Sequence, residues 1–381
     1  MNNSIYDNYV VRPVKISETE SFIKALQKLY HPKLYQIQKK YINWAYRSTF
    51  KKIFTKESEL TIMAAINKNL SQIEAVVGFI AGVSFVKNKQ LKTIWDIEYL
   101  NLSNVPGLAL KVLENLKLKT DIYCGNGLNN KCYRSYQRVF NKKNFKEEVN
   151  RKIAVIDSIN CNKIFNIEKN LEKLNFLTDS ESKIKNCKVN QVYDLKDISE
   201  KYWNNHIERF ENSSDRRKNY LEWRFLQHPY MKYNILSLDS KANKGLAIVR
   251  IEKMKNFNFN ALRILDLFPV KGFEPDILNL VLNFGKENNC IFADFFCSSE
   301  KKMSEVCFDP FIDFEKHRNF NIPYRLQPPQ VTEKKSFNLF INFNDDKELK
   351  TEEFYSTKTD GEMDLYFDQS GGPSSNIEEN I

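Results

Sequence analysis

Two carboxylates lie close together in a segment that is otherwise built for burial. Asp96 and Glu98 occur in the run Ile-Trp-Asp-Ile-Glu-Tyr-Leu, whose alternation predicts a β-strand over residues 94–102. Successive side chains of a strand point to opposite faces, so both acids and Leu100 are expected on one face. A positioned carboxylate can take a proton from an attacking amine. Glu98, nearer the following turn, is the candidate base, and Asp96 is a candidate substrate-binding residue. The alternative is a strand face that points to solvent.

The turn after this strand has the composition of an anion-binding loop. It reads Asn-Val-Pro-Gly-Leu-Ala over residues 104–109 and enters an amphipathic helix predicted at 107–116. Small residues let the backbone approach a pyrophosphate, and free N–H groups with the helix dipole stabilise its charge. Pro106 removes one backbone donor from the loop. The alternative is an ordinary strand-to-helix turn with proline near the first helical position.

Strand-like and helix-like runs alternate along the whole chain, which predicts a mixed α/β fold. In the first half, strands are expected at 10–14, 60–66, 75–85, 94–102, 122–124 and 152–156, and helices at 18–30, 36–46, 107–116 and 130–140. In the second half, helices are expected at 198–210, 220–226, 276–286 and 300–306, and strands at 233–238, 245–252, 261–268, 291–297 and 336–343.

Three short segments of the first half recur in the second half in the same order. Residues 41–46 match 220–225, residues 78–81 resemble 245–248, and residues 121–124 resemble 294–297, at offsets of 179, 167 and 173 positions. An ordered repeat at nearly constant offset predicts a tandem duplication, and chance similarity between aromatic-rich segments is the alternative. We predict two domains at 1–159 and 191–345, a lysine-rich linker at 160–190, and a mobile polar tail at 346–381.

The turn at 104–109 resembles the pyrophosphate loop of the GNAT superfamily of acyltransferases. That loop has Gln or Arg, two residues, Gly, one residue, and then Gly or Ala; here Asn104 stands in the first position. The resemblance covers most of residues 10–157 and implies two GNAT-like domains, each a mixed, mostly antiparallel sheet flanked by helices. It also implies that the first domain binds an acyl-coenzyme A. The residues it assigns to that site are Leu100, Leu102, Asn104, Val105, Gly107, Leu108, Ala109 and Asn130.

The resemblance further implies a proton donor on the helix predicted at 130–140. In the family, an Asn near the start of this helix often contacts the pantetheine, and a later Tyr often protonates the leaving thiolate. Asn130, Tyr133 and Tyr136 occupy these positions, and their spacing does not distinguish between the two tyrosines. Either tyrosine could instead fill the core.

The second half lacks the pyrophosphate loop and carries a different motif. Residues 265–275 contain one glycine and two prolines, with an acid where the anion would sit. The motif Trp223-Arg224…His228-Pro229 is similar to an element of GNAT-like proteins from bacterial surface-polysaccharide gene clusters. The apolar face of Trp223 and the cationic Arg224 and His228 would suit a sugar or a phosphorylated sugar. The alternative is a helix anchored by Trp223. Residues 355–364 also resemble the ends of those proteins, which predicts a turn that folds back over the second domain.

Composition limits the partners of the chain. The 381 residues carry 58 basic and 48 acidic side chains, a net charge of +10, and the lysines are spread evenly rather than clustered, so nucleic-acid binding is not expected. The seven cysteines stand singly and the four histidines show no metal-ligand spacing, so we predict no metal. No run reaches the roughly 18 apolar residues of a membrane span, and no leader is visible, which predicts a cytoplasmic protein.

These observations favour an acyl-CoA-dependent N-acyltransferase. It would use acetyl-CoA or another acyl-CoA to modify an amino sugar, possibly a nucleotide-linked one, in bacterial surface glycan biosynthesis. One alternative is a Fem-type aminoacyl transferase that takes its amino acid from charged tRNA. Another is a catalytically inactive GNAT-like binding protein.

Overall fold

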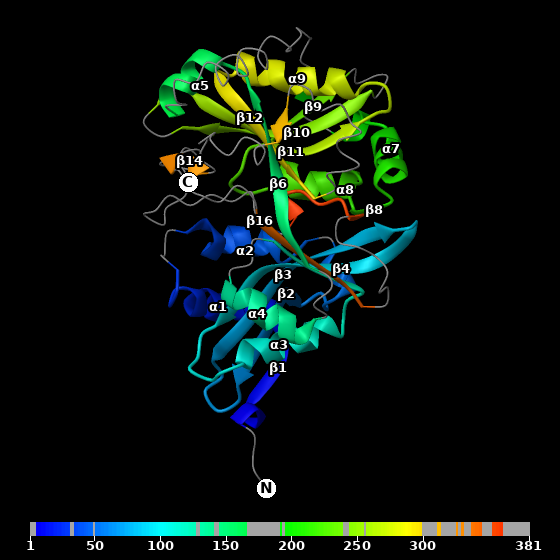
Figure 1. Cartoon of the computed structure of the whole chain (residues 1–381). Coiled ribbons are helices and arrows are strands. Elements are labelled where there is room, and N and C mark those ends of the chain that lie inside the picture. Colours follow the sequence, from blue (N-terminus) through cyan, green and yellow to red (C-terminus); the bar gives the residue numbers. More distant parts are fainter. Residues whose placement is uncertain are drawn as a thin grey trace.

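Two lobes, each built on a mixed sheet, make up the chain in a computed structural model (Figure 1). The structure describes residues 5–30, 34–48, 50–126, 130–140, 145–165, 191–192, 195–238, 244–254, 257–298, 311–313, 325–326, 329–330, 337–344 and 353–360. Most neighbouring strands in both lobes are antiparallel, and helices flank both sheets. The predicted α/β class with two such units is therefore confirmed.

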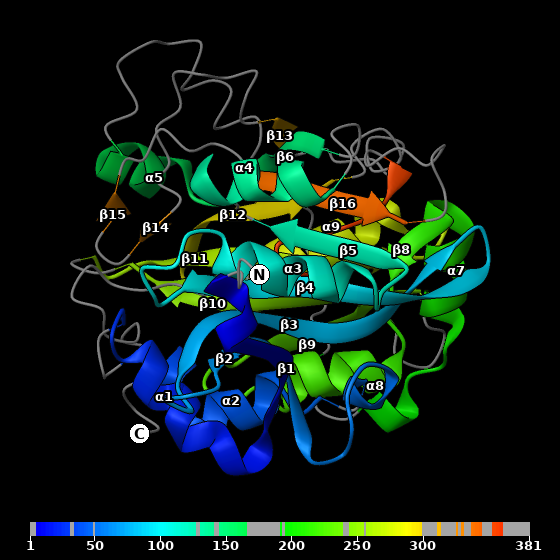
Figure 2. The ribbon, with the colours of Figure 1, turned by 90° about the horizontal axis from the view of Figure 1, so that it is seen from below.

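The first lobe carries five strands as neighbours in chain order. They are β1 (Tyr9–Lys15), β2 (Glu59–Asn67), β3 (Ile73–Val86), β4 (Lys89–Asn101) and β5 (Ile122–Asn126), and the helices are α1 (Thr19–Leu26), α2 (Lys39–Ala45), α3 (Leu108–Lys117) and α4 (Asn130–Val139). β1 to β4 are antiparallel, and β4 and β5 are parallel because α3 connects them. α1 and α2 cover one face of this sheet, and α3 and α4 cover the other (Figure 2).

The second lobe repeats this arrangement. Its strands are β7 (Gln191–Val192), β9 (Asn234–Leu238), β10 (Gly245–Lys253), β11 (Asn260–Pro269) and β12 (Cys290–Cys297), and its helices are α5 (Ser158–Phe165), α7 (Lys201–Phe210), α8 (Lys218–Leu221), a π-helical turn (Glu222–Leu226) and α9 (Glu274–Glu287). β11 and β12 are parallel, with α9 between them, as β4 and β5 are with α3. Short strands complete the set: β8 (Asn212–Ser214) pairs with β3, β13 (Ile312–Asp313) joins the second sheet, and β14 (Arg325–Leu326) pairs with β15 (Pro329–Gln330).

The lobes exchange one strand each. β6 (Phe145–Val155) leaves the first lobe and pairs through residues 150–155 with β12 of the second (Figure 1). β16 (Phe337–Phe343) returns from the second half of the chain and lies between β5 and the start of β6. We expected the strand at 336–343 to complete the second domain, and the pairing corrects this. The local pattern of a strand predicts that it is buried but does not specify its neighbour.

A shared core, which we call the inner core, fills the space between the lobes. It holds side chains of α1 and α2 from one lobe and of α8, β10 and β11 from the other. At its centre the rings of Trp44 and Trp223 stack, 5.1 Å apart and inclined by 15°. Each indole N–H donates to the main-chain carbonyl of the other tryptophan, at 2.9 and 3.2 Å. This reciprocal contact is what equivalent residues of a duplicated unit would make.

Bulges at equivalent places fix the register of the repeat. Ile97 is the extra residue where β3 pairs with β4, and Leu265 is the extra residue where β10 pairs with β11. The bulges make Glu98 equivalent to Asp266. Gly78 lies opposite Glu98 and Ile248 lies opposite Asp266, so Gly78 is equivalent to Ile248. The sequence matches of residues 78–81 and 121–124 are therefore displaced by three residues from the structural equivalents.

Two segments differ from expectation. The predicted linker at 160–190 begins inside α5, and its residues 166–190 lie outside the described residues, as does the helix predicted at 300–306. Within the tail predicted as mobile, residues 353–360 are ordered and residues 354–360 are buried between the lobes. We call residues 353–360 the C-terminal strap. It is held by polar contacts with the rest of the chain, which composition could not show.

Candidate functional site

The parallel strands β4 and β5 separate at one defined point. Their pairing runs from Thr93 and Ile122 to Asp96 and Gly125, and then ends. β4 continues to Asn101, past the bulge at Ile97, without β5 beside it. We call this point the splay. A bulge at such a point turns the following backbone away from its neighbour and changes the direction of the side chains.

The bulge places Asp96 and Glu98 on opposite faces of the sheet. Before it, Ile94 packs against the core beneath α3 and α4, which we call the outer core, and Trp95 packs in the inner core. After it, Tyr99 contacts the outer core and Leu100 contacts the inner core. The prediction that Asp96, Glu98 and Leu100 share one face is therefore wrong for Asp96, because the extra residue breaks the alternation of side chains.

Glu98 has the properties of a general base. It is half-buried beside the inner core, and the Tyr30 hydroxyl donates to its Oε2 at 2.9 Å. Burial raises the pKa of Glu98 to about 7, and the Tyr30 hydrogen bond opposes part of that rise. A base with a pKa near the working pH is the most effective in proton transfer. Gly78, which lies opposite Glu98 on β3, leaves room for Tyr46, because a Cβ at Gly78 would lie 2.9 Å from the Tyr46 ring.

Asp96 lies on the other face in a different environment. It is buried, and burial raises its pKa to about 8. The Tyr123 hydroxyl, which faces the carboxyl, opposes part of that rise. Asp96 therefore faces the outer core and does not accompany Glu98 as predicted.

The turn at 104–109 offers free amides at the start of α3. Gly107 precedes the helix with φ of +75°, a conformation that glycine adopts without strain. Among the described residues, the N–H groups of Ala109 and Leu110 have no acceptor. The Val105 amide, which we expected to be available, donates to the Ser103 hydroxyl at 3.2 Å. Asn104 is exposed, and Leu108 donates only at 3.5 Å to the Val105 carbonyl.

The residues predicted on α4 divide into two groups. Tyr136 is fully buried in the outer core, with its ring centroid 5.7 Å from that of Tyr99 and 5.9 Å from that of Tyr123. Asn130 and Tyr133 lie on the first turns of the helix, and their side chains lie outside what the structure describes. The choice between the two tyrosines stays open.

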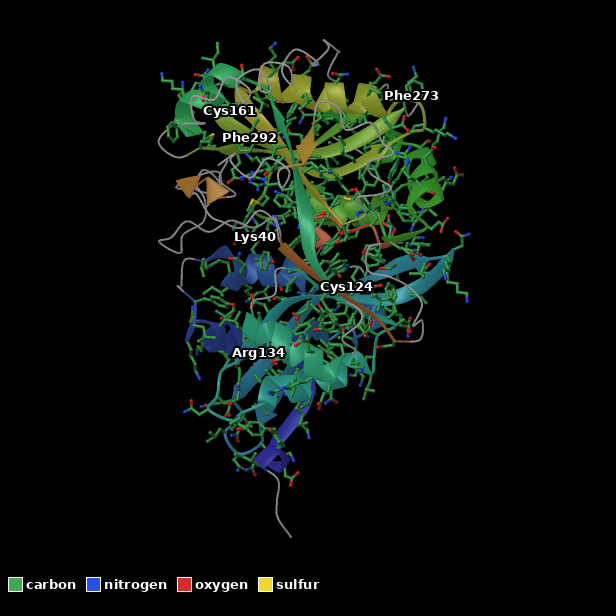
Figure 3. The ribbon with its side chains drawn as sticks, in the orientation of Figure 1. Lys40, Cys124, Arg134, Cys161, Phe273 and Phe292 are labelled. Atoms are coloured by element: carbon green, nitrogen blue, oxygen red, sulfur yellow. The ribbon has the colours of Figure 1, made fainter. Side chains whose placement is uncertain are left out.

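Cys124 lies on β5 where the two lobes meet (Figure 3). It pairs with Trp95 one step before the splay and is fully buried. Burial raises the pKa of the Cys124 thiol well above its usual range. Since a thiolate is the reactive form, Cys124 is suited to packing and not to nucleophilic attack.

The second lobe fills its own equivalent positions. The carboxylate of Glu274, at the start of α9, accepts from the Gly272 amide at 2.7 Å and from Arg209 at 2.6 Å. It thus occupies the anion position that the first lobe leaves free. Asp266, the equivalent of Glu98, accepts from Arg216 at 2.6 Å and from the Tyr355 hydroxyl at 2.7 Å. Neither group is available to a ligand.

Trp223, Arg224 and His228 are brought together, but in the core. All three are buried, and the Arg224 guanidinium donates to the Thr359 carbonyl at 3.3 Å and lies over the Trp44 ring. The His228 ring packs 4.2 Å from the Trp44 ring. Their predicted role in binding a sugar is therefore corrected: they hold the lobes and the C-terminal strap together. The sequence motif predicted that these side chains bind a sugar and did not show that Trp44 of the first lobe would cover them.

Neither metal ligands nor membrane helices stand out in the described part of the chain. It contains no group of three or more His, Cys, Asp or Glu side chains placed to hold a metal ion. None of its helices has the length and apolarity needed to cross a bilayer.

Similarity to known proteins is visible in structure and not in sequence. No protein-family model and no curated protein matches the sequence. The N-myristoyltransferase of Saccharomyces cerevisiae with bound myristoyl-CoA is similar with a TM-score of 0.51 at 10% identity, over 92% of this chain and 85% of that chain. A GCN5-related N-acetyltransferase from Anabaena variabilis is similar with a TM-score of 0.51 at 9% identity, over 87% and 72%. The chain therefore has the two-lobed GNAT fold.

Proposed function

We propose that this protein is an acyl-CoA-dependent N-acyltransferase whose reaction centre is the splay of the first lobe. The observation that carries the proposal is Glu98, a half-buried carboxyl with a pKa of about 7, two residues beyond the last β4–β5 pair. The GNAT fold of the chain supports it, because both similar structures are N-acyltransferases.

The acyl donor would lie across the splay. Its pyrophosphate would accept from the Ala109 and Leu110 amides, where the dipole of α3 favours negative charge. Gly107 has no side chain to obstruct this approach, and Tyr6 fixes the loop by donating to the Pro106 carbonyl at 2.8 Å. The pantetheine arm would follow β4 from Leu102 back toward the bulge, because no described strand pairs with that edge beyond Asp96.

Transfer would be direct. The acceptor amine attacks the thioester carbonyl and forms the C–N bond, and Glu98 takes the proton that the amine nitrogen loses. The C–S bond then breaks and releases coenzyme A as a thiolate. Tyr133 and Tyr136 remain the candidate donors of the proton that this thiolate takes up. The raised pKa of Cys124 favours this route over a covalent intermediate. The second lobe would be structural, because Glu274 and Asp266 are already bound.

The acceptor is proposed more coarsely than the donor. An amine is the acceptor class of the similar N-acyltransferases, and a base at Glu98 could take its proton. An amino sugar of a surface glycan, and a cytoplasmic location, remain predictions from the sequence resemblance; the buried Trp223, Arg224 and His228 lend the sugar no support.

Titration calorimetry with acetyl-CoA, longer acyl-CoAs and coenzyme A tests the proposal. Wild-type protein should bind them, and Gly107→Val should weaken binding at least tenfold because a branched side chain is strained at φ of +75°. Glu98→Gln should bind as wild type but, with an amine panel, turn over roughly 10²–10⁴-fold more slowly. Absence of acyl-CoA binding would refute the proposal and favour the inactive-protein alternative, or the Fem-type alternative if charged tRNA bound instead.

A further inference from the structure

The Tyr30 hydroxyl reaches Glu98 from a distant part of the chain. It donates to Glu98 Oε2 at 2.9 Å, and the two residues are 68 positions apart. Tyr30 follows α1, and its amide donates to the Leu26 carbonyl at 2.9 Å, so the helical turn continues to this residue. Leu26 is buried in the inner core and anchors the turn. Packing of α1 therefore fixes the hydroxyl beside β4.

The surroundings of Glu98 are held by the same helix. A Cβ on Gly78 would lie 2.9 Å from the Tyr46 hydroxyl and 3.2 Å from the Glu98 Cβ, so the glycine lets these two residues approach. The Tyr46 ring packs edge-on against the ring of Phe22 on α1, with centroids 6.1 Å apart. The helix that places Tyr30 therefore also packs against the residue next to Glu98.

The hydrogen bond from Tyr30 distinguishes the two oxygens of the carboxylate. Oε2 accepts from the hydroxyl, and none of the described residues donates to Oε1. A hydrogen bond to a charged acceptor favours the charged form. Burial acts in the opposite direction and raises the pKa of Glu98 to about 7. Without the Tyr30 hydroxyl, more of the carboxyl would therefore be protonated at neutral pH and unable to act as a base.

We infer that Tyr30 is a positioning residue for the base: it orients Glu98 through Oε2, keeps it ionised and leaves Oε1 to take the proton of the acceptor amine. The inference rests on the proposed function. Among the described residues, Tyr46 and Asp96 are also ionisable and close to Glu98. The Tyr46 hydroxyl lies beside Gly78, and Asp96 lies on the opposite face of β4, where a pKa of about 8 keeps it largely protonated near neutral pH. Both groups are retained when only the Tyr30 hydroxyl is removed.

The pH dependence of kcat/KM in Tyr30→Phe tests this inference, with acetyl-CoA, or the longer acyl-CoA that reacts faster, and one amine throughout. This profile reports the pKa of the base in the free enzyme. Removing the hydroxyl should move the acid limb to higher pH, so that kcat/KM falls about tenfold at pH 6.5 and little above about pH 9. The Kd for the acyl-CoA should stay as in the wild type. Tyr9→Phe is the matched control, because it removes the same kind of bond, to Glu74 Oε2 at 2.6 Å, elsewhere on the sheet.

Carbon-13 NMR of labelled glutamate side chains follows the titration of Glu98 without turnover. Glu98→Gln identifies its signal, and the midpoint should be higher in Tyr30→Phe and unchanged in Tyr9→Phe. If the midpoint or the acid limb stays where it is in the wild type, the inference fails while the acyltransferase proposal stands. A loss of kcat/KM that is equal at every pH would mean that Tyr30 only supports the fold, which also refutes the inference. If the wild type binds no acyl-CoA, the proposed function fails and the inference fails with it.

Discussion

Removing the charge of Arg216 should destabilise the protein more than removing either carboxylate bound to it. Arg216 follows β8 and binds Asp266 on β11 and Asp360 in the C-terminal strap. The three side chains are at most 1% exposed. The Tyr355 hydroxyl also donates to Asp266, and the Thr357 amide donates to Asp360. Two buried carboxylates therefore share one buried cation.

The size of the effect follows from the charges that remain. Arg216→Met leaves two buried carboxylates without a cation, and breaking a buried pair in this way costs about 3–5 kcal/mol. Asp360→Asn leaves a neutral Arg216–Asp266 pair, and the new amide oxygen can still accept from Thr357. Its cost should be that of weakened hydrogen bonds, about 1–2 kcal/mol.

Urea unfolding followed by fluorescence and by circular dichroism measures these differences. Arg12→Met is the matched control, because both partners of its ion pair with Glu18 reach the surface, with 30% of the Arg12 side chain and 29% of the Glu18 side chain exposed. It should cost less than about 1 kcal/mol. The reasoning is refuted if Arg216→Met costs no more than Arg12→Met, or less than Asp360→Asn.

Three further predictions concern buried groups. Burial raises the pKa of Asp96 to about 8, so the folded protein keeps a proton that the unfolded chain releases near pH 4. The contribution of Asp96 to the free energy of unfolding should therefore fall as pH rises between these values, by at most about 1.4 kcal/mol per pH unit. Glu98, with a pKa of about 7, adds a slope of the same sign up to that pH, so Asp96→Asn should reduce the pH dependence between unfolding curves at pH 5 and pH 8 without abolishing it; an unchanged slope would contradict this. Trp223→Phe leaves the Trp44 carbonyl without its donor and should cost about 1–3 kcal/mol in urea unfolding, whereas a cost below 0.5 kcal/mol would mean that the contact is not formed. Tyr355→Phe removes a donor to Asp266 and should lower the thermal midpoint, and an unchanged midpoint would count against the strap contact.

The sequence predicted helices and strands well where burial of one face alone sets the spacing of the apolar residues. The helix at 107–116 was visible because its buried residues, Leu108, Val112 and Leu116 among them, recur every four positions. The candidate base and the loop before α3 were inferred from residue types next to such elements, and their roles stay predictions. These features are local, and a sequence records local features directly.

Contacts between distant segments were not predictable. The run Trp95-Asp96-Ile97-Glu98 alternates without interruption, so the bulge that separates the two acids is invisible until β3 is set beside it. Arg216 and Asp360 are 144 positions apart, and nothing in either neighbourhood indicates the other. The burial of Arg224 depends in turn on the strap that those residues hold.

The strand exchange makes the order of synthesis matter. β5 receives its neighbour β16 only when residue 343 has been made, whereas β6, which serves the second lobe, is complete at residue 155. At synthesis rates of about 5–20 residues per second, the edge of β5 stays open for roughly ten to forty seconds on the ribosome. An open edge invites pairing with other chains. A chain truncated before β16 would therefore leave the edge of β5 open to association with other chains and would not complete the first lobe.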